Sequence, residues 1–150
     1  MNIAHIIGNG LKTGLALAVS TTASLLLASH AENGAPWAAL NAVAHIVDGD
    51  EKEQPTQFSP RESGLGLAVN ATAMVTWGVL YEGVLTVTKT RSTPMTAAVG
   101  TVTAYLIDYA IVPKRLTPGI EKRLSRNTVW AIYGVLGATL ALSSRWTREA

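Results

Sequence analysis

Uncharged, mostly apolar stretches alternate along the chain with short polar connections. Asp, Glu, Lys and Arg are absent from residues 13–31, 63–81, 92–107 and 127–144. A transmembrane helix needs about 20 mostly apolar residues, because the hydrocarbon core is about 30 Å thick and each helical residue rises about 1.5 Å. The pattern therefore predicts an all-α polytopic membrane protein with a bundle of about four transmembrane helices. The predicted spans cover residues 11–29, 64–88, 95–112 and 127–144.

A shorter apolar segment lies between the first two predicted spans. Pro36, a residue type favoured at the first helical position, marks a helix start, and apolar residues recur at helical spacing over residues 36–47. This segment is too short to cross a bilayer, so it is predicted to be an interfacial or re-entrant helix with Trp37 at headgroup level. Residues 48–63 are polar and contain two prolines, Pro55 and Pro60, which predicts a solvated loop.

Composition supports this interpretation. The chain has 150 residues, of which 48% are apolar, only 15% are charged and none is cysteine. Soluble domains carry roughly 25% charged residues. The length predicts a single domain over residues 1–150. A disordered chain, a disulfide-stapled secreted module and a cysteine-based metal or redox site are excluded. The net charge of +2 and the pI near 9.1 do not indicate nucleic-acid binding.

Two alternatives to four spans remain open. A soluble four-helix bundle would need charged outer faces, which these stretches lack, although the mean hydropathy is only +0.25. The first stretch also resembles a signal peptide with small residues at Ser29-His30-Ala31, and cleavage there would leave three spans. Lys12 is the one basic residue of its leader, and Thr and Ser residues interrupt its apolar region, which favours an uncleaved span.

Small residues recur every fourth position on the predicted spans, which lets helix backbones approach closely in a membrane. The stripes are Gly10, Gly14, Ala18 and Thr22, and Ala16, Ser20, Ser24 and Ala28, in the first span; Gly100, Ala104 and Asp108 in the third; and Gly134 with Ala138, or Gly137 with Ala141, in the fourth. They favour packing within the chain over a dedicated partner face. The short connection Lys89–Pro94 predicts an antiparallel hairpin of the second and third spans.

Glu82 and Asp108 are acidic residues inside the predicted spans, and Asn70 is a further polar residue there. In the predicted hairpin the two carboxylates lie nearer opposite membrane faces, so they are not a paired acid–base dyad. A carboxylate at such depth costs about 3 kcal/mol on insertion scales. Two roles remain open: a structural hydrogen bond or reach to an interface, and a proton or cation relay. The expected structural partners are Asn70, Tyr81, Thr101, Thr103 and Tyr105, with Arg115 as an ionic partner for Asp108.

Candidate metal or haem ligands are His30, His45 and Asp48. His30 ends the first span, and His45 precedes Asp48 by one helical turn. The sequence has no HExxH motif, no Glu-x-x-His pair and no cysteine. We therefore expect an interfacial histidine and a solvated acidic loop, with no metal and no cofactor. A metal- or haem-binding role is the weaker alternative.

A dense run of basic residues follows the third span. Pro113 ends that span, Thr117-Pro118-Gly119 predicts a turn, and residues 120–126 predict a short basic amphipathic helix. Basic residues near a membrane attract anionic headgroups by about 1 kcal/mol each. The predicted contacts with headgroups, or alternatively with a protein partner, are Lys114, Arg115, Lys122, Arg123 and Arg126. Basic residues are divided too evenly between the two sides for the positive-inside rule to assign an orientation.

Three segments give the chain a resemblance to a family of small bacterial inner-membrane proteins of no assigned activity. They are WAALNAVAHIVDGD (37–50), GLGLAVNATAMVTWGVLYE (64–82) and DYAIVPKRLTPGIEKRLS (108–125). The resemblance implies a multi-pass inner-membrane location and the helix count, but no reaction. Family members carry histidines near the start of the second span, where this chain has Asn70 and Ala71, so no shared metal site is implied.

The sequence contains no recognisable catalytic constellation, and we expect no enzymatic activity. Small size and small-residue helix faces favour an accessory or assembly subunit of a larger membrane complex. Its expected partners are the lipid bilayer and other membrane subunits or further copies of the chain. The alternative is a small oligomeric transporter or channel that uses Glu82 and Asp108.

Overall fold

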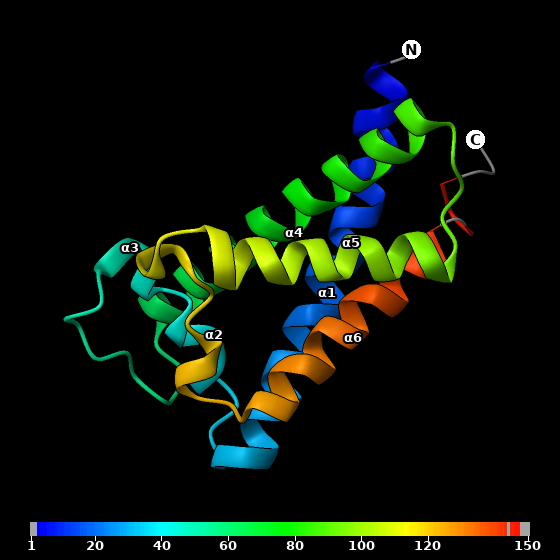
Figure 1. Cartoon of the computed structure of the whole chain (residues 1–150). Coiled ribbons are helices and arrows are strands. Elements are labelled where there is room, and N and C mark those ends of the chain that lie inside the picture. Colours follow the sequence, from blue (N-terminus) through cyan, green and yellow to red (C-terminus); the bar gives the residue numbers. More distant parts are fainter. Residues whose placement is uncertain (1–2, 144, 148–150) are drawn as a thin grey trace.

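The computed structural model describes residues 3–143 and 145–147, and all regular elements in that part of the chain are helical (Figure 1). The long helices are α1 (Ile3–Asn33), α4 (Pro60–Thr88), α5 (Pro94–Leu106) and α6 (Arg126–Ser143), and a π turn, η1 (Ile107–Ile111), continues α5. The short elements are α2 (Ala38–Ala42), α3 (His45–Asp48), η2 (Lys114–Leu116) and η3 (Ile120–Lys122). The all-helical prediction is confirmed. Helices α1 and α4 are long and apolar enough to cross a membrane.

Local sequence signals set the ends of these helices. Gly34, with φ of 65°, follows the last residue of α1 in the left-handed conformation that commonly ends a helix. Pro60 occupies the first turn of α4, where its missing N–H costs nothing. At the start of α5, Thr93 and Thr96 form a capping box: the Thr93 hydroxyl accepts from the Thr96 N–H, and the Thr96 hydroxyl accepts from the Thr93 N–H at 2.9 Å.

Helices α1 and α4 pack closely along one another because glycines face each other (Figure 1). A Cβ atom added to Gly14 would lie 2.5 Å from the Cα of Val75, and one added to Gly78 would lie 2.4 Å from the backbone N of Gly14. Such distances leave no room for a side chain. The predicted stripe Gly10, Gly14 and Ala18 is therefore the buried face of α1, and its partner is α4.

The second pair is α5 and α6, and α6 also contacts α1. Of the two stripes considered for α6, the one containing Gly137 is used: a Cβ there would lie 2.7 Å from the Thr101 hydroxyl, whereas Gly134 has no atom within 4 Å of that position. The Thr139 hydroxyl donates to Ser20 of α1 at 3.0 Å. Apolar side chains from α1, α4, α5 and α6 form a common core, which includes Leu17, Met74, Tyr81, Ala97, Leu136 and Leu140.

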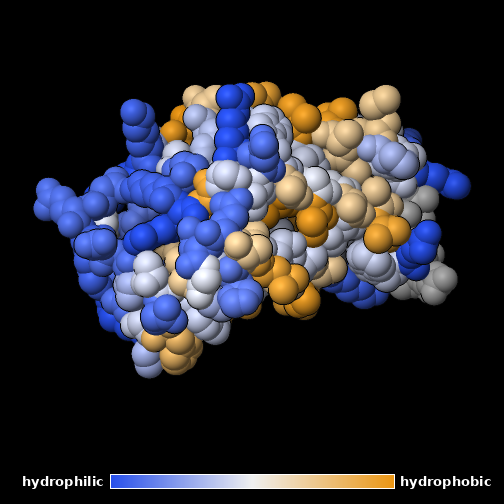
Figure 2. All heavy atoms as spheres, turned by 90° about the horizontal axis from the view of Figure 1, so that it is seen from below, coloured by the Kyte–Doolittle hydropathy of each residue, from blue (hydrophilic) through white to orange (hydrophobic). Residues whose placement is uncertain are grey.

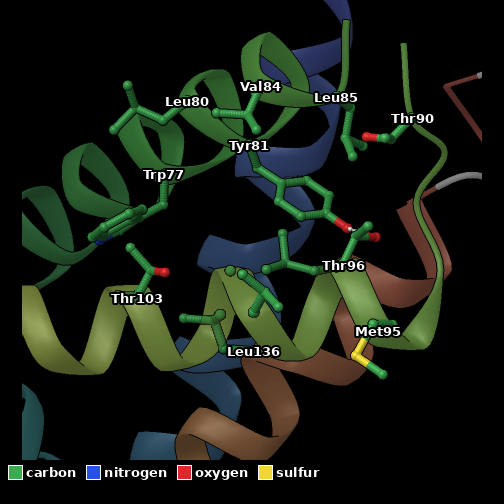
Figure 3. A pocket seen from close by; sticks show the side chains of 14 residues that line it. Trp77, Leu80, Tyr81, Val84, Leu85, Thr90, Met95, Thr96, Thr103 and Leu136 are labelled. Carbon is green, nitrogen blue, oxygen red and sulfur yellow. Dashed lines mark hydrogen bonds between the residues drawn. The ribbon is translucent and has the colours of Figure 1, made fainter. Parts of the chain in front are cut away.

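The predicted hairpin of the second and third spans is correct in direction but wrong in packing. Helices α4 and α5 run in opposite directions in Figure 1, yet α4 packs against α1, and α5 packs against α6. The aromatic side chains of Trp77 and Tyr81 extend from α4 into the space between α4 and α5 (Figure 3). The short linker restrains only the helix ends, while the glycine contacts decide which backbones approach.

One end of the molecule is a polar cap formed by α2, α3 and residues 49–59 and 112–125. Figure 2 shows hydrophilic residues gathered at this end and apolar residues over the middle of the molecule. Residues 38–45, which lie in the segment predicted to be an interfacial or re-entrant helix over 36–47, are buried against protein. The cause is Gly66 of α4, where a Cβ would lie 2.1 Å from the Leu40 carbonyl oxygen, so that α2 rests directly on the α4 backbone.

The loop predicted to be solvated is held to the helices by ion pairs and hydrogen bonds. Asp48 receives two hydrogen bonds from the Arg61 guanidinium, at 2.6 and 2.7 Å, and a third from Lys52 at 3.1 Å. These contacts hold the pKa of the Asp48 carboxyl well below its ordinary value. Lys52 also pairs with Glu62 at 2.7 Å. The polar cap is thus an ordered part of the fold.

Candidate functional site

The candidate site is a cavity of about 110 Å³ where α1, α4, α6 and η1 meet the polar cap. Asn70, Asp108 and Tyr133 contribute its polar groups together with Thr21, and the remaining lining is mostly apolar. Two of the predicted intramembrane polar residues, Asn70 and Asp108, therefore share one cavity. We call it the Asp108 cavity.

Asp108 is positioned by a local break in helix geometry. The chain leaves α-helical geometry after Leu106 and makes one π turn, closed by the hydrogen bond from Val112 N to Ile107 O at 3.0 Å. Pro113 follows directly and cannot donate the next helical hydrogen bond. Single π turns are frequent at functional sites because they re-aim one side chain. Here the turn carries the carboxylate that lines the cavity.

The partners of Asp108 and Asn70 come from other helices. The Tyr133 hydroxyl of α6 donates to the Asp108 carboxylate at 2.6 Å. The Asn70 side-chain amide donates to the hydroxyls of Thr21 at 3.2 Å and Thr22 at 3.0 Å, both on α1. None of the partners predicted for Asp108 is the observed one, because the third and fourth helices, rather than the second and third, pack together at this depth. Nothing in the sequence pointed to Tyr133 as the partner, except that it carries a hydroxyl within an uncharged stretch.

A cluster of aromatic rings packs around Tyr133, which lines the Asp108 cavity. Tyr105 stacks on Trp130 with ring centroids 4.2 Å apart and contacts Tyr133 edge-on at 5.2 Å. Tyr109 lies 5.0 Å from Tyr105, and its hydroxyl donates to Glu121 of the cap at 3.2 Å. Tyr and Trp are enriched where helices leave the bilayer. The cluster joins the apolar helices to the polar cap.

Glu82 lies in a different place. It is buried, and its carboxylate accepts a hydrogen bond from the Thr13 hydroxyl of α1 at 2.8 Å. It lines a recess with His5, Asn9 and Ser92, and this recess shares no lining residue with the Asp108 cavity. The two carboxylates therefore do not form a pair. Thr13 was not among the partners expected for Glu82, since its neighbour is α1 rather than the third span.

The structure does not bring His30, His45 and Asp48 together. His30 is exposed at the end of α1, and Asp48 is held by Arg61 and Lys52. The buried His45 ring donates from Nδ1 to the Ala42 carbonyl at 2.8 Å and packs beneath Gly119. Among the residues that the structure describes, no group of three or more His, Cys, Asp or Glu side chains is arranged to hold a metal ion.

The basic segment differs from the predicted amphipathic helix. Residues 120–122 form only one 3-10 turn, η3, and the long helix α6 begins at Arg126. Ser125, the residue before α6, donates hydrogen bonds to the Glu32 carboxylate from its backbone N–H and its hydroxyl. Lys122 pairs with Asp50 at 2.7 Å, and Arg123 donates to the Gln54 carbonyl at 2.8 Å. These two cations hold the polar cap together. The exposed basic residues of this region are Lys114, Arg115, Lys122 and Arg126, and headgroup or partner contact stays a prediction for them and for Arg123.

Three segments, residues 37–50, 64–82 and 108–125, meet in this part of the fold. Residues 37–50 form α2 and α3, residues 64–82 lie in α4, and residues 108–125 run from η1 to the start of α6. The Asp108 cavity takes lining residues from each of them. No family model, curated protein or solved structure matches the chain.

Proposed function

We propose that the chain is a multi-pass membrane protein of the bacterial inner membrane, with α1, α4, α5 plus η1, and α6 each crossing the bilayer. The support is the outer surface of these helices, which exposes large apolar side chains on every one of them. Examples are Leu15 and Val19 on α1, Val84 on α4, Met95 and Val99 on α5, and Leu142 on α6. A soluble monomer rarely exposes such extended apolar faces.

Retention of the first helix is part of this proposal. Gly10 and Gly14 of α1 bring its backbone close to that of α4, and the Thr13 hydroxyl of α1 donates a hydrogen bond to Glu82. A chain cut after residue 31 would expose this face of α4. The packing supports an uncleaved first span.

Within the membrane we propose that the protein acts as a non-enzymatic accessory or assembly subunit of a larger complex. The observation that carries this proposal is that each intramembrane carboxylate is bound by its own chain, in separate sites, by Thr13 and by Tyr133. Glu82 joins α4 to α1, and Asp108 joins η1 to α6. Both carboxylates thus hold helices together, and the exposed helix faces are left for lipid and for other subunits or further copies.

We expect the chain to leave its native membrane as part of a larger particle. The measurement is extraction in a mild detergent, followed by native mass determination and identification of the co-migrating proteins. Defined partners in constant ratio are the expected result, since apolar helix faces in a complex are covered by other subunits. A chain that always migrates alone as a monomer would contradict the proposal. A homo-oligomer would favour the second candidate function.

The second candidate function is a proton or cation relay through the Asp108 cavity. It is favoured by one observation: Asn70, Asp108 and Tyr133 line the same cavity beside a π turn. Intramembrane carboxylates at such positions mark ion pathways in transporters. In sealed vesicles containing the purified chain, Asp108→Asn should abolish proton flux while preserving the fold, because the amide oxygen still accepts from Tyr133. Glu82→Gln, outside the cavity, is the matched control, and equal flux in wild type and D108N would remove this candidate.

A further inference from the structure

We infer that the groove between α4 and α5 is a binding site for one phospholipid with an anionic headgroup. The groove has a volume of about 260 Å³ and is closed at its base by α6 (Figure 3). Its walls are almost entirely apolar, and the principal lining residues are Trp77, Tyr81, Val84, Met95, Val99 and Leu136. The inference rests on the membrane placement proposed above, and it adds a ligand that the proposed function does not name.

The groove exists because Tyr81 holds α4 and α5 apart. Its ring lies between the two helices (Figure 3). Its hydroxyl is within hydrogen-bonding distance of the hydroxyls of Ser92, at 3.0 Å, and Thr96, at 3.2 Å. A Cβ at Gly100 would lie 3.2 Å from this ring, so the small residue lets the ring sit against α5. With its hydroxyl bonded, Tyr81 presents only apolar surface to the groove.

The groove opens sideways, toward the region that lipid would occupy. Leu80 and Val84 on the α4 rim are 52% and 59% exposed, and Met95 and Val99 on the α5 rim are 73% and 60% exposed. An aqueous ligand would have to cross this apolar rim. An acyl chain would enter from the bilayer without leaving an apolar medium.

The dimensions of the groove fit one acyl chain of one leaflet. Its α4 wall runs from Trp77 to Leu85, which corresponds to about 12 Å of helix. One leaflet of the hydrocarbon core is about 15 Å deep, half of the full thickness of about 30 Å. Because these residues belong to the second half of α4, the groove lies in the leaflet that ends at the linker between α4 and α5.

Positive charge on the linker between α4 and α5, at one end of the groove, favours a lipid with an anionic headgroup. The linker that joins the two walls carries Lys89 and Arg91, both exposed, and Thr90 between them lines the groove itself. Within residues 3–143 and 145–147, neither cation forms an ion pair with the chain. A lipid whose chain fills the groove would therefore place its phosphate and an anionic headgroup beside two uncompensated positive charges.

The test titrates the detergent-purified full chain with phosphatidylglycerol and with phosphatidylcholine of the same acyl chains, and native mass spectrometry counts the lipids retained. We expect one retained lipid and a preference for phosphatidylglycerol of about fivefold for each contributing cation, the factor that corresponds to about 1 kcal/mol. K89Q/R91Q should remove the preference but keep the lipid. The control K12Q, which alters an exposed cation of α1, a helix that contributes no lining residue to the groove, should keep both.

A second variant tests the groove itself. Val99→Phe places a ring in the groove and should reduce lipid retention severalfold, whereas Val19→Phe, on the exposed face of α1, should not. Equal retention in V99F and V19F, or an unchanged preference in K89Q/R91Q, would overturn the inference. A dimer that V99F disrupts would overturn it in favour of a second copy as the occupant. A chain released from membranes by alkaline carbonate would refute the membrane placement, whereas a membrane-embedded chain without retained lipid would refute only the lipid site.

Discussion

Replacing Gly14 by Ala should destabilise the helix pair α1–α4, and Gly14→Leu should leave little folded protein in detergent. The added Cβ would lie 2.5 Å from the Cα of Val75 and 3.1 Å from the Met74 carbonyl oxygen. Both are backbone atoms, so relief requires one helix to move away from the other. Overpacking of this kind costs about 1–3 kcal/mol for a small group, and more for a larger one. Thermal unfolding followed by circular dichroism, and the monodisperse fraction after gel filtration, measure the loss.

Gly8→Ala and Gly134→Ala are the matched controls for this prediction. Both glycines lie in long helices, and within the described part of the chain no atom outside the local helix backbone lies within 4 Å of either added Cβ position. Since Ala has the higher helix propensity, these variants should be as stable as the wild type or slightly more stable. If G8A and G14A lowered the unfolding temperature equally, the close contact of α1 and α4 would be wrong. The same result would remove the main support for keeping the first helix in the mature protein.

The arrangement of helices along the chain was predictable from charge alone. Each uncharged stretch became a long helix, and Pro113 lies just past the end of η1 as predicted, whereas Pro60, which was assigned to the loop over 48–63, begins α4. The stripe of Gly10 and Gly14 was also visible, because spacing by four places residues on one face of a helix. These features depend on neighbours in sequence, which is why they could be predicted without knowing the tertiary fold.

Which helices pack together was not predictable, because that choice depends on residues far apart in the chain. Gly78 gives no indication in the sequence that it faces Gly14, and a short linker suggested the wrong partner for α4. The hydrogen-bond partners of the carboxylates followed from this error. Thr13 and Tyr133 became neighbours of Glu82 and Asp108 only through the pairing of α1 with α4 and of α5 with α6.

The polar cap shows contacts that composition does not reveal. Residues 48–63 were predicted to be a solvated loop because their composition is polar, and most residues between 50 and 61 are exposed. Composition could not show that Asp48, Arg61 and Lys52 also pair with one another. The segment over 36–47 was predicted to be an interfacial or re-entrant helix because it is short and apolar, and the sequence did not show that α2 packs on the α4 backbone at Gly66.

Asn41→Ala should release the loop of the polar cap from the helices. Asn41 is fully buried, and its amide donates to the carbonyls of Pro55 and Gln57, both at 2.8 Å. Its carbonyl oxygen accepts from the Ser63 hydroxyl of α4, also at 2.8 Å. One side chain thus joins α2, the loop and the start of α4. A buried polar group left without a partner costs about 1–3 kcal/mol, so the loop carbonyls should turn to water and the loop should detach.

Limited trypsin digestion measures this release, because Lys52 lies within the loop and is held by Asp48 and Glu62 in the intact cap. Cleavage after Lys52 should be many times faster in N41A, and the mid-point of thermal unfolding should fall. Asn127→Ala, at an exposed position in the first turn of α6, is the control and should be cut at the wild-type rate. Since removing Asn41 leaves the ion pairs of Asp48 intact, an unchanged rate in N41A would mean that those ion pairs alone hold the loop, and the central role assigned to Asn41 would be wrong.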